Sequence, residues 1–217
     1  MRVKTPRVLS QTLPAVKLKS AVLLKKLVRE LVHTAIGVFL LAIGARVKFI
    51  APFTLVPFTL QTMFLHYLLF IHGKRAWRYV AAYVLLGLAG IPVFAYGGGV
   101  LYVFSPTFGY LVGFVLGTLV AGLITPLGAL SLKRGLTAGF TQLAIIYTMG
   151  ATWLAVWYVL IRGLSFTNGL ILAVVTGVLP FIAWDTLKLL TALALSRVTI
   201  AAYIRIYQKI KKYATSH

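Results

Sequence analysis

The sequence predicts an all-α integral membrane protein with six transmembrane helices and both termini in the cytoplasm. Three observations support this class: 60% of the 217 residues are hydrophobic, only 11% are charged, and the basic residues gather in clusters between long apolar segments. A typical soluble domain carries about 25% charged residues, so this composition is that of a chain surrounded by lipid. The chain has no cysteine, which excludes disulfides, thiolate metal sites and a cysteine nucleophile.

Residues 1–30 are predicted to form a basic amphipathic segment at the cytoplasmic membrane surface. They contain eight Lys or Arg residues, and from Leu23 to Val32 pairs of apolar residues alternate with charged ones. A basic amphipathic helix of this kind is attracted to anionic lipid. Two alternatives stay open: a simple solvated tail over residues 1–20, and a signal-peptide core over residues 31–45 with a cleavage-like Ala-Ile-Gly-Ala end.

The six-helix membrane domain is predicted to cover residues 31–196, with three interruptions. Two prolines five residues apart forbid a regular helix in residues 46–57, which favours a stiff aromatic loop or lid. Residues 91–109 contain two prolines and three consecutive glycines, and irregular backbone is tolerated at membrane depth only over a cavity or at the surface. Pro180 divides the final apolar stretch. The six spans are expected at residues 31–45, 59–71, 79–90, 110–132, 136–161 and 180–196, and a short helix at residues 169–179 precedes the last of them.

The positions of Lys and Arg predict the orientation. With six spans, eighteen basic residues fall on one side and three, Arg46, Lys48 and Arg162, fall on the other. The positive-inside rule then predicts a multi-pass protein of the cytoplasmic (plasma) membrane, with residues 197–217 as a basic cytoplasmic tail. This placement explains the net charge of +20 with the lipid bilayer, and not nucleic acid, as the partner. The irregular segments and the Pro180 turn are expected to meet at the outer side.

Asp185 is the principal candidate for a functional residue. It is one of only two acidic residues in the chain, and it lies in an apolar run three positions before Lys188. Charged side chains at membrane depth cost about 2.5 to 3.5 kcal/mol on insertion scales, so they persist where they pair, face a cavity or have a function. At this spacing the two side chains project from nearly the same face of a helix. Two interpretations stay open, and they are compatible: the pair belongs to a ligand pocket, or it is a mutually neutralising ion pair.

Other chemistry finds little support in the sequence. The four histidines have no metal-ligand spacing with carboxylates, so we expect no metal site and no cofactor. A Gly-x-x-x-x-Gly-Lys motif is absent, so ATP hydrolysis would have to come from a partner. An intramembrane aspartyl protease would need a second membrane carboxylate, whereas Glu30 lies in the basic entry segment. We therefore expect that the protein is not an enzyme.

Four motifs in order carry a resemblance to a known family. They are Val56-Pro-Phe-Thr-Leu-Gln-Thr, Gly90-Ile-Pro-Val-Phe-Ala with its glycine run, Ser105-Pro-Thr-Phe-Gly-Tyr-Leu, and Val178-Leu-Pro-Phe-Ile-Ala-Trp-Asp-Thr-Leu-Lys. Together they resemble the BioY family, the biotin-specific S components of energy-coupling-factor (ECF) vitamin transporters. The resemblance implies six helices, a biotin pocket near the outer leaflet, high-affinity biotin uptake, and assembly with a transmembrane coupling subunit and two cytoplasmic ATPase subunits.

The resemblance also supplies a ligand for the charged pair. The Asp185 carboxylate can accept from the ureido N–H groups of biotin, while the Lys188 ammonium neutralises the ligand carboxylate or balances Asp185. The other expected substrate-binding residues come from the two irregular segments and the helices that follow them: Tyr96, Gly97, Gly98, Gly99 and Tyr110, and Phe53, Phe58 and Gln61. The alternative for these residues is turn formation or packing.

Two features depart from the family pattern. The first helix lacks the two alanines at four-residue spacing that family members usually present to the coupling protein, and the basic N-terminus is long. Both leave the docking surface open and leave room for a solitary biotin transporter. An S component for another vitamin and a purely structural membrane subunit are the remaining alternatives.

Overall fold

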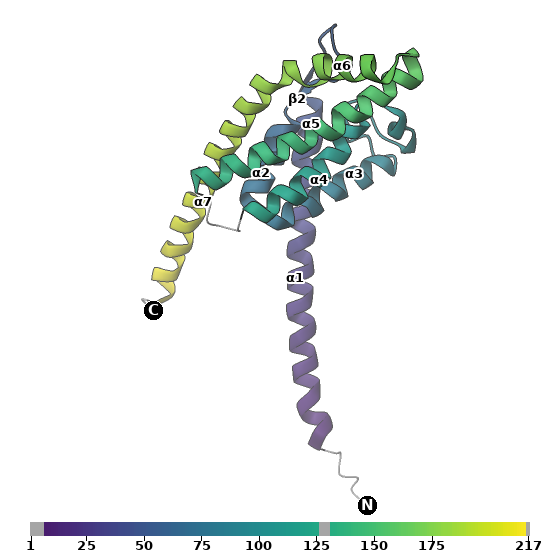
Figure 1. Cartoon of the computed structure of the whole chain (residues 1–217). Coiled ribbons are helices and arrows are strands. Elements are labelled where there is room, and N and C mark those ends of the chain that lie inside the picture. Colours follow the sequence, from purple (N-terminus) through teal and green to yellow (C-terminus); the bar gives the residue numbers. More distant parts are fainter. Residues whose placement is uncertain (1–6, 126–130, 216–217) are drawn as a thin grey trace, which may run out of the picture. The chain divides into compact units, whose positions relative to one another are not determined.

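The computed structural model describes residues 7–125 and 131–215, and it consists mainly of helices (Figure 1). Three short 3-10 helices, Gly73–Arg75, Val100–Phe104 and Leu179–Phe181, connect some of the main elements. The chain divides into two compact units, Met1–Ile36 and Gly37–His217. The main elements, in chain order, are α1 (Arg7–Arg46), β1 (Lys48–Phe49), β2 (Phe58–Thr59), α2 (Gln61–His72), α3 (Ala76–Leu88), α4 (Phe108–Ile124), α5 (Leu132–Arg162), α6 (Phe166–Gly177) and α7 (Ile182–Thr215).

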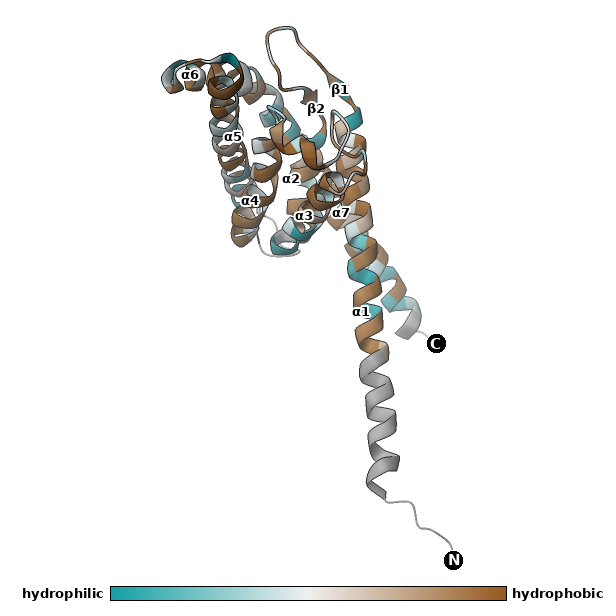
Figure 2. Ribbon diagram, turned by 90° about the vertical axis from the view of Figure 1, so that its right-hand side faces the viewer, coloured by the Kyte–Doolittle hydropathy of each residue, from teal (hydrophilic) through white to brown (hydrophobic). Residues whose placement is uncertain are grey.

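The helices have the character of a membrane protein. Three stretches are long and apolar enough to cross a membrane, namely Ala21–Arg46, Leu132–Arg162 and Phe166–Tyr213, and α4 is a shorter apolar helix. Figure 2 shows hydrophobic residues along most of α4 and α5. With 12 and 13 residues, α2 and α3 are shorter than the ~20 residues that cross a bilayer core. The mostly helical membrane class is confirmed, while six crossings and the orientation of the termini stay predictions.

Local sequence explains where several helices begin and end. The Ser131 hydroxyl accepts a hydrogen bond from the backbone N–H of Arg134, which caps α5, and Ser165 caps α6 in the same way. Gly163 ends α5 in the left-handed conformation, with φ of 65°, which costs glycine little. Pro180 lies in the 3-10 turn before α7, as the sequence predicts.

Several borders between the predicted segments do not coincide with the ends of helices or strands. Residues 46–57, expected as a loop, contain β1, which pairs with β2 in an antiparallel hairpin. The expected border between the last span and the tail, at residues 196 and 197, lies inside the continuous helix α7, because no glycine or proline interrupts that helix. The border expected at residues 30 and 31 likewise lies inside α1. The expected end of the 110–132 helix falls partly on residues 126–130, outside the described residues.

Three irregular connections meet at one end of the Gly37–His217 unit (Figures 1 and 2). The Arg46 guanidinium donates to the carbonyl of Pro92, and the Lys48 ammonium donates to the carbonyl of Ala95. These bonds join the end of α1 and the β hairpin to the segment between α3 and α4. The Tyr110 hydroxyl of α4 donates to the carbonyl of Gly177 at 2.8 Å, where α6 turns toward α7. The sequence predicts this meeting of irregular segments.

A buried polar network fixes α2, α4 and α5 to one another. The Gln142 amide nitrogen donates to the Thr118 hydroxyl at 2.6 Å, and Thr118 donates to the Phe114 carbonyl at 2.6 Å. The Gln142 amide oxygen therefore faces His66 Nδ1, 2.7 Å away, which assigns the ring proton to that nitrogen. Each helix thus supplies a polar group that another helix satisfies.

Tyr110 depends on glycines in two neighbouring helices. A Cβ atom at Gly150 would overlap the Tyr110 ring, and one at Gly177 would overlap its hydroxyl. Both glycines are buried. Close approach of α4, α5 and α6 therefore requires that these positions lack a side chain.

We predict that Gly150→Ala lowers the thermal stability of the detergent-purified protein. The added methyl overlaps a buried ring, and overpacking of this kind costs about 1 to 3 kcal/mol, or about 3 to 10 °C in the midpoint for a chain of this length. Ala144→Val, which adds methyl groups at an exposed position of the same helix, is the matched control. Equal midpoints for the two variants would show that the Tyr110 contact does not limit stability.

Candidate functional site

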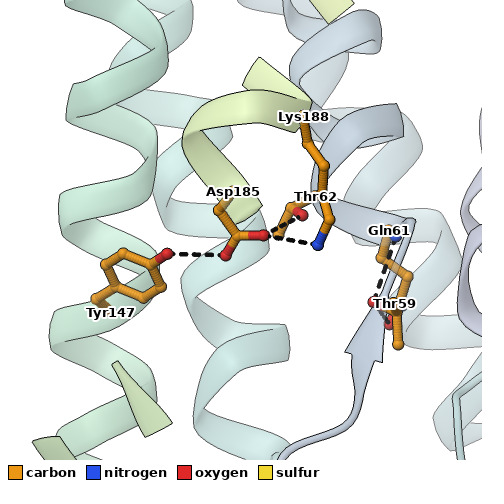
Figure 3. Close-up of polar contacts among 6 residues, drawn as sticks. All are labelled: Thr59, Gln61, Thr62, Tyr147, Asp185 and Lys188. Atoms are coloured by element: carbon orange, nitrogen blue, oxygen red, sulfur yellow. Dashed lines mark hydrogen bonds and ion pairs between the residues drawn. The ribbon is translucent and has the colours of Figure 1, made fainter. Parts of the chain in front are cut away.

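Asp185 lies in the first turn of α7 and is almost fully buried, with 3% of its surface exposed. Three donors surround its carboxylate (Figure 3). The Thr62 hydroxyl from α2 and the Lys188 ammonium both donate to Oδ1 at 2.8 Å, and the Tyr147 hydroxyl from α5 donates to Oδ2 at 2.8 Å. A helix N-terminus also favours a negative charge. The local environment therefore stabilises an ionised carboxylate inside the protein.

The hydrogen bonds at Asp185 leave part of the hydrogen-bond acceptor capacity of its carboxylate open to a ligand. A carboxylate offers about four acceptor positions, and the three donors occupy two on Oδ1 and one on Oδ2. One position on Oδ2, beside the Tyr147 hydroxyl, is left. The Lys188 side chain is 12% exposed, and its ammonium has three N–H groups, of which one binds Asp185. The site can therefore accept one N–H at Asp185 and hold an anion at Lys188.

A cavity adjoins this charged pair. It lies between the β hairpin, α2, α4, α5 and the start of α7, and both polar and aromatic side chains face it. Its lining consists of Val56, Pro57, Thr59, Gln61, Thr62, Ala95, Tyr102, Thr107, Tyr110, Leu111, Phe114, Ile146, Tyr147, Phe181, Asp185 and Lys188. The mixture of apolar walls and a few convergent polar groups is typical of small-molecule sites.

Four of the residues predicted from the sequence line the cavity: Asp185, Lys188, Gln61 and Tyr110. The Gln61 amide nitrogen donates to the Tyr83 hydroxyl at 2.7 Å, so its carbonyl side is directed elsewhere and lies 3.3 Å from the Thr59 hydroxyl. The Tyr110 hydroxyl is already bonded to Gly177, so Tyr110 offers its ring to the cavity. These four residues stay predictions as ligand contacts.

Two of the three phenylalanines of the hairpin, Phe53 and Phe58, are predicted to close over a ligand. Phe58 stacks on Phe181 with the ring centroids 4.2 Å apart, and Phe181 lines the cavity. Phe53 is 58% exposed. Neither Phe53 nor Phe58 is among the lining residues, and their closure over a ligand stays a prediction.

The glycine segment has a local structural role. Gly97 and Gly99 have φ of 115° and 106°, values that side-chain-bearing residues rarely adopt, and a Cβ atom at Gly98 would overlap the Ile91 carbonyl. The neighbouring Tyr96 is 45% exposed and lies under the Lys48 ammonium, 4.8 Å from it. The structure places these four residues outside the cavity lining, and direct contact with a ligand stays a prediction.

Several lining residues escape sequence reasoning. Thr62 and Tyr147 bind Asp185, yet they are 123 and 38 residues away from it in the chain. Tyr102 and Thr107 also line the cavity, with their hydroxyl oxygens 3.1 Å apart. Burial raises the pKa of Tyr102 above its usual value, so its phenol keeps its proton. Thr62 ends the first of the four family motifs and lies four residues before His66, and these are the signals that could have found it.

The comparisons with known proteins agree with the motifs. The model of the BioY family matches residues 12–205. The chain belongs to the BioY family. A BioY protein from Thermotoga maritima, named biotin transporter, is 37% identical over 166 residues, which cover 76% of this chain and 91% of that protein. A probable biotin transporter BioY from Lysinibacillus sphaericus is 40% identical over 129 residues, 58% of this chain and 65% of that protein.

A solved structure supports the BioY fold. The crystal structure of an S-component for biotin from an ECF-type ABC transporter matches with a TM-score of 0.57 and 23% identity, over 81% of this chain and 93% of that one. At this identity the match shows the shared fold. The predicted family and the membrane class are therefore confirmed, and an intramembrane protease is not supported.

We predict that Lys188→Met destabilises the protein by about 3 kcal/mol, because removing one partner leaves a buried carboxylate without its countercharge. The double variant Asp185→Asn with Lys188→Met removes both charges and should regain most of that loss. Thermal unfolding of the purified variants measures both effects. If the double variant were less stable than Lys188→Met alone, the ion pair would not be the interaction that stabilises this site.

Proposed function

We propose that this BioY protein binds biotin with high affinity and takes it up across the cytoplasmic membrane, as the substrate-specific subunit of an ECF-type transporter. The observation that carries the proposal is the buried Asp185 carboxylate, which retains one acceptor position beside a cavity in a chain of this family. The names of the similar proteins support biotin as the ligand.

The geometry suits the three chemical parts of biotin. Its ureido group donates an N–H to Oδ2 of Asp185, next to Tyr147, because that oxygen keeps a free acceptor position. The apolar thiophane ring lies among the aromatic walls, which include Tyr110 and Phe181. The anionic valerate is balanced by Lys188, whose other N–H groups are available beyond its bond to Asp185. Recognition thus uses one acceptor, one cation and an apolar wall.

Uptake requires that ligand enters from outside and leaves inward. In this proposal the chain crosses the membrane six times with both termini inside, so the hairpin end of the Gly37–His217 unit faces outward. A transmembrane coupling subunit and two cytoplasmic ATPase subunits bind it and supply the energy for its reorientation. ATP hydrolysis belongs to those partners, and the BioY chain contributes ligand selection. The excess of basic residues at the opposite helix ends supports this orientation.

We predict that Asp185→Asn weakens biotin binding at least about a hundredfold, because the acceptor loses its charge and half of its acceptor capacity. Isothermal calorimetry on detergent-purified protein measures this change. Tyr67→Phe, which removes an exposed hydroxyl that pairs with Thr199, is the control and should bind like the parent protein. Unchanged affinity in Asp185→Asn would refute the site, and a thermal shift with thiamine or riboflavin but not biotin would refute the ligand.

The orientation can be tested with single cysteines, since the chain has none of its own. We predict that Asn168→Cys, at an exposed position in α6, reacts with a membrane-impermeant maleimide added to intact cells. Arg134→Cys, exposed near the start of α5, should react only after the cells are permeabilised. The reverse pattern would place the cavity mouth on the cytoplasmic side and contradict the proposed direction of capture.

A further inference from the structure

An open groove lies directly beside the cavity, between the β hairpin and the first turns of α7. The groove is lined by Val47, Lys48, Phe49, Phe53, Phe58, Thr59, Leu60, Trp184 and Lys188. Thr59 and Lys188 line the cavity as well. The two spaces therefore adjoin at these two side chains.

The groove has a defined chemistry. Phe49, Phe53 and Trp184 are each more than half exposed, so they offer aromatic surface that no part of the Gly37–His217 unit covers. The lining contains two cations, Lys48 and Lys188, and no acidic side chain. Such a surface suits an apolar chain that carries a carboxylate, because aromatic rings hold the chain and an ammonium binds the anion.

Lys48 is positioned to bind a carboxylate at the far side of the groove. Its ammonium donates one hydrogen bond to the Ala95 carbonyl and lies 4.8 Å from the centre of the Tyr96 ring. These contacts hold the ammonium in place while leaving further N–H groups for a ligand, since a lysine has three. Lys188 and Lys48 thus mark the inner and outer parts of the groove.

We propose that this groove is a tail subsite, which admits biotin derivatives amidated at the valerate carboxyl and ending in a second carboxylate. Biotinyl-lysine, whose terminal carbon carries an α-ammonium as well as the carboxylate, is one member of this class, and hydrolysis of a protein that carries biotin on a lysine side chain yields it. The inference rests on the proposed function: a ureido ring at Asp185 directs the valerate toward Lys188, where the groove begins. The lysine methylenes then contact Trp184, and the terminal carboxylate reaches Lys48.

A comparison of three ligands separates the effect of losing the valerate charge from the effect of a tail that does not fit. Calorimetry on the full chain in detergent compares biotin, biotinamide and biotinyl-lysine. Biotinamide lacks the carboxylate and adds no tail, so it sets the reference for the amide bond itself. The tail subsite predicts that biotinyl-lysine binds at least as tightly as biotinamide. If biotinyl-lysine bound more than about tenfold more weakly, the groove would not accept a tail and the inference would fail.

Substitution of Trp184 tests whether the tail of biotinyl-lysine lies in the groove. Trp184→Ala should weaken biotinyl-lysine about tenfold, the scale of a lost aromatic contact, while biotin and biotinamide stay within about twofold. Phe166→Ala, at an exposed position of α6 outside both spaces, is the matched control and should change none of the three. Equal effects on all three ligands, or no effect on any, would overturn the subsite. Failure of biotin itself to bind would instead refute the proposed function.

Discussion

The hydrogen bonds and the ion pair at the Asp185 carboxylate are the interactions on which both the fold and the site depend. A buried ion requires donors, and here they come from Thr62 in α2, Tyr147 in α5 and Lys188 in α7. Each hydrogen bond to a charged group contributes about 1.5 to 3 kcal/mol. These bonds therefore hold α2, α5 and α7 together around the carboxylate. The same bonds define which lone pair a ligand can use. Structural and functional constraints therefore meet at one carboxyl group.

At the end of the Gly37–His217 unit that holds the cavity, the irregular segments are joined by hydrogen bonds from basic side chains to backbone carbonyls, without acidic residues. Arg46 and Lys48 bind the carbonyls of Pro92 and Ala95, since Asp185 is the single acid in that unit and it is committed elsewhere. Cation-to-carbonyl bonds satisfy irregular backbone that would otherwise lack partners. They also leave the positive charge uncompensated, which attracts anionic ligands to this end. Arg46 and Lys48 thus hold the irregular segments at this end together and also give it a positive charge.

Sequence reasoning succeeds where one local signal is strong. Scarcity of acids and the three-residue spacing identify Asp185 and Lys188, and prolines and glycines identify the irregular segments. It fails for Thr62 and Tyr147, because their role depends on the rotation and depth of separate helices. For Gly97 and Gly99 the positive φ values show a role in the turn, while their contact with a ligand stays a prediction. The helical continuation of α7 into the basic residues after Ser196 is not predicted, although no glycine or proline interrupts it.

The spacing of Asp185 and Lys188 has a consequence for biogenesis. Both residues belong to α7 and bond to each other, so the acid carries its countercharge before it meets Thr62 or Tyr147. A segment that enters the translocon with such a pair has no net charge from it, and two opposite charges in contact are easier to move into lipid than two separate ions. The helix that completes the cavity can therefore cross the membrane before the cavity exists.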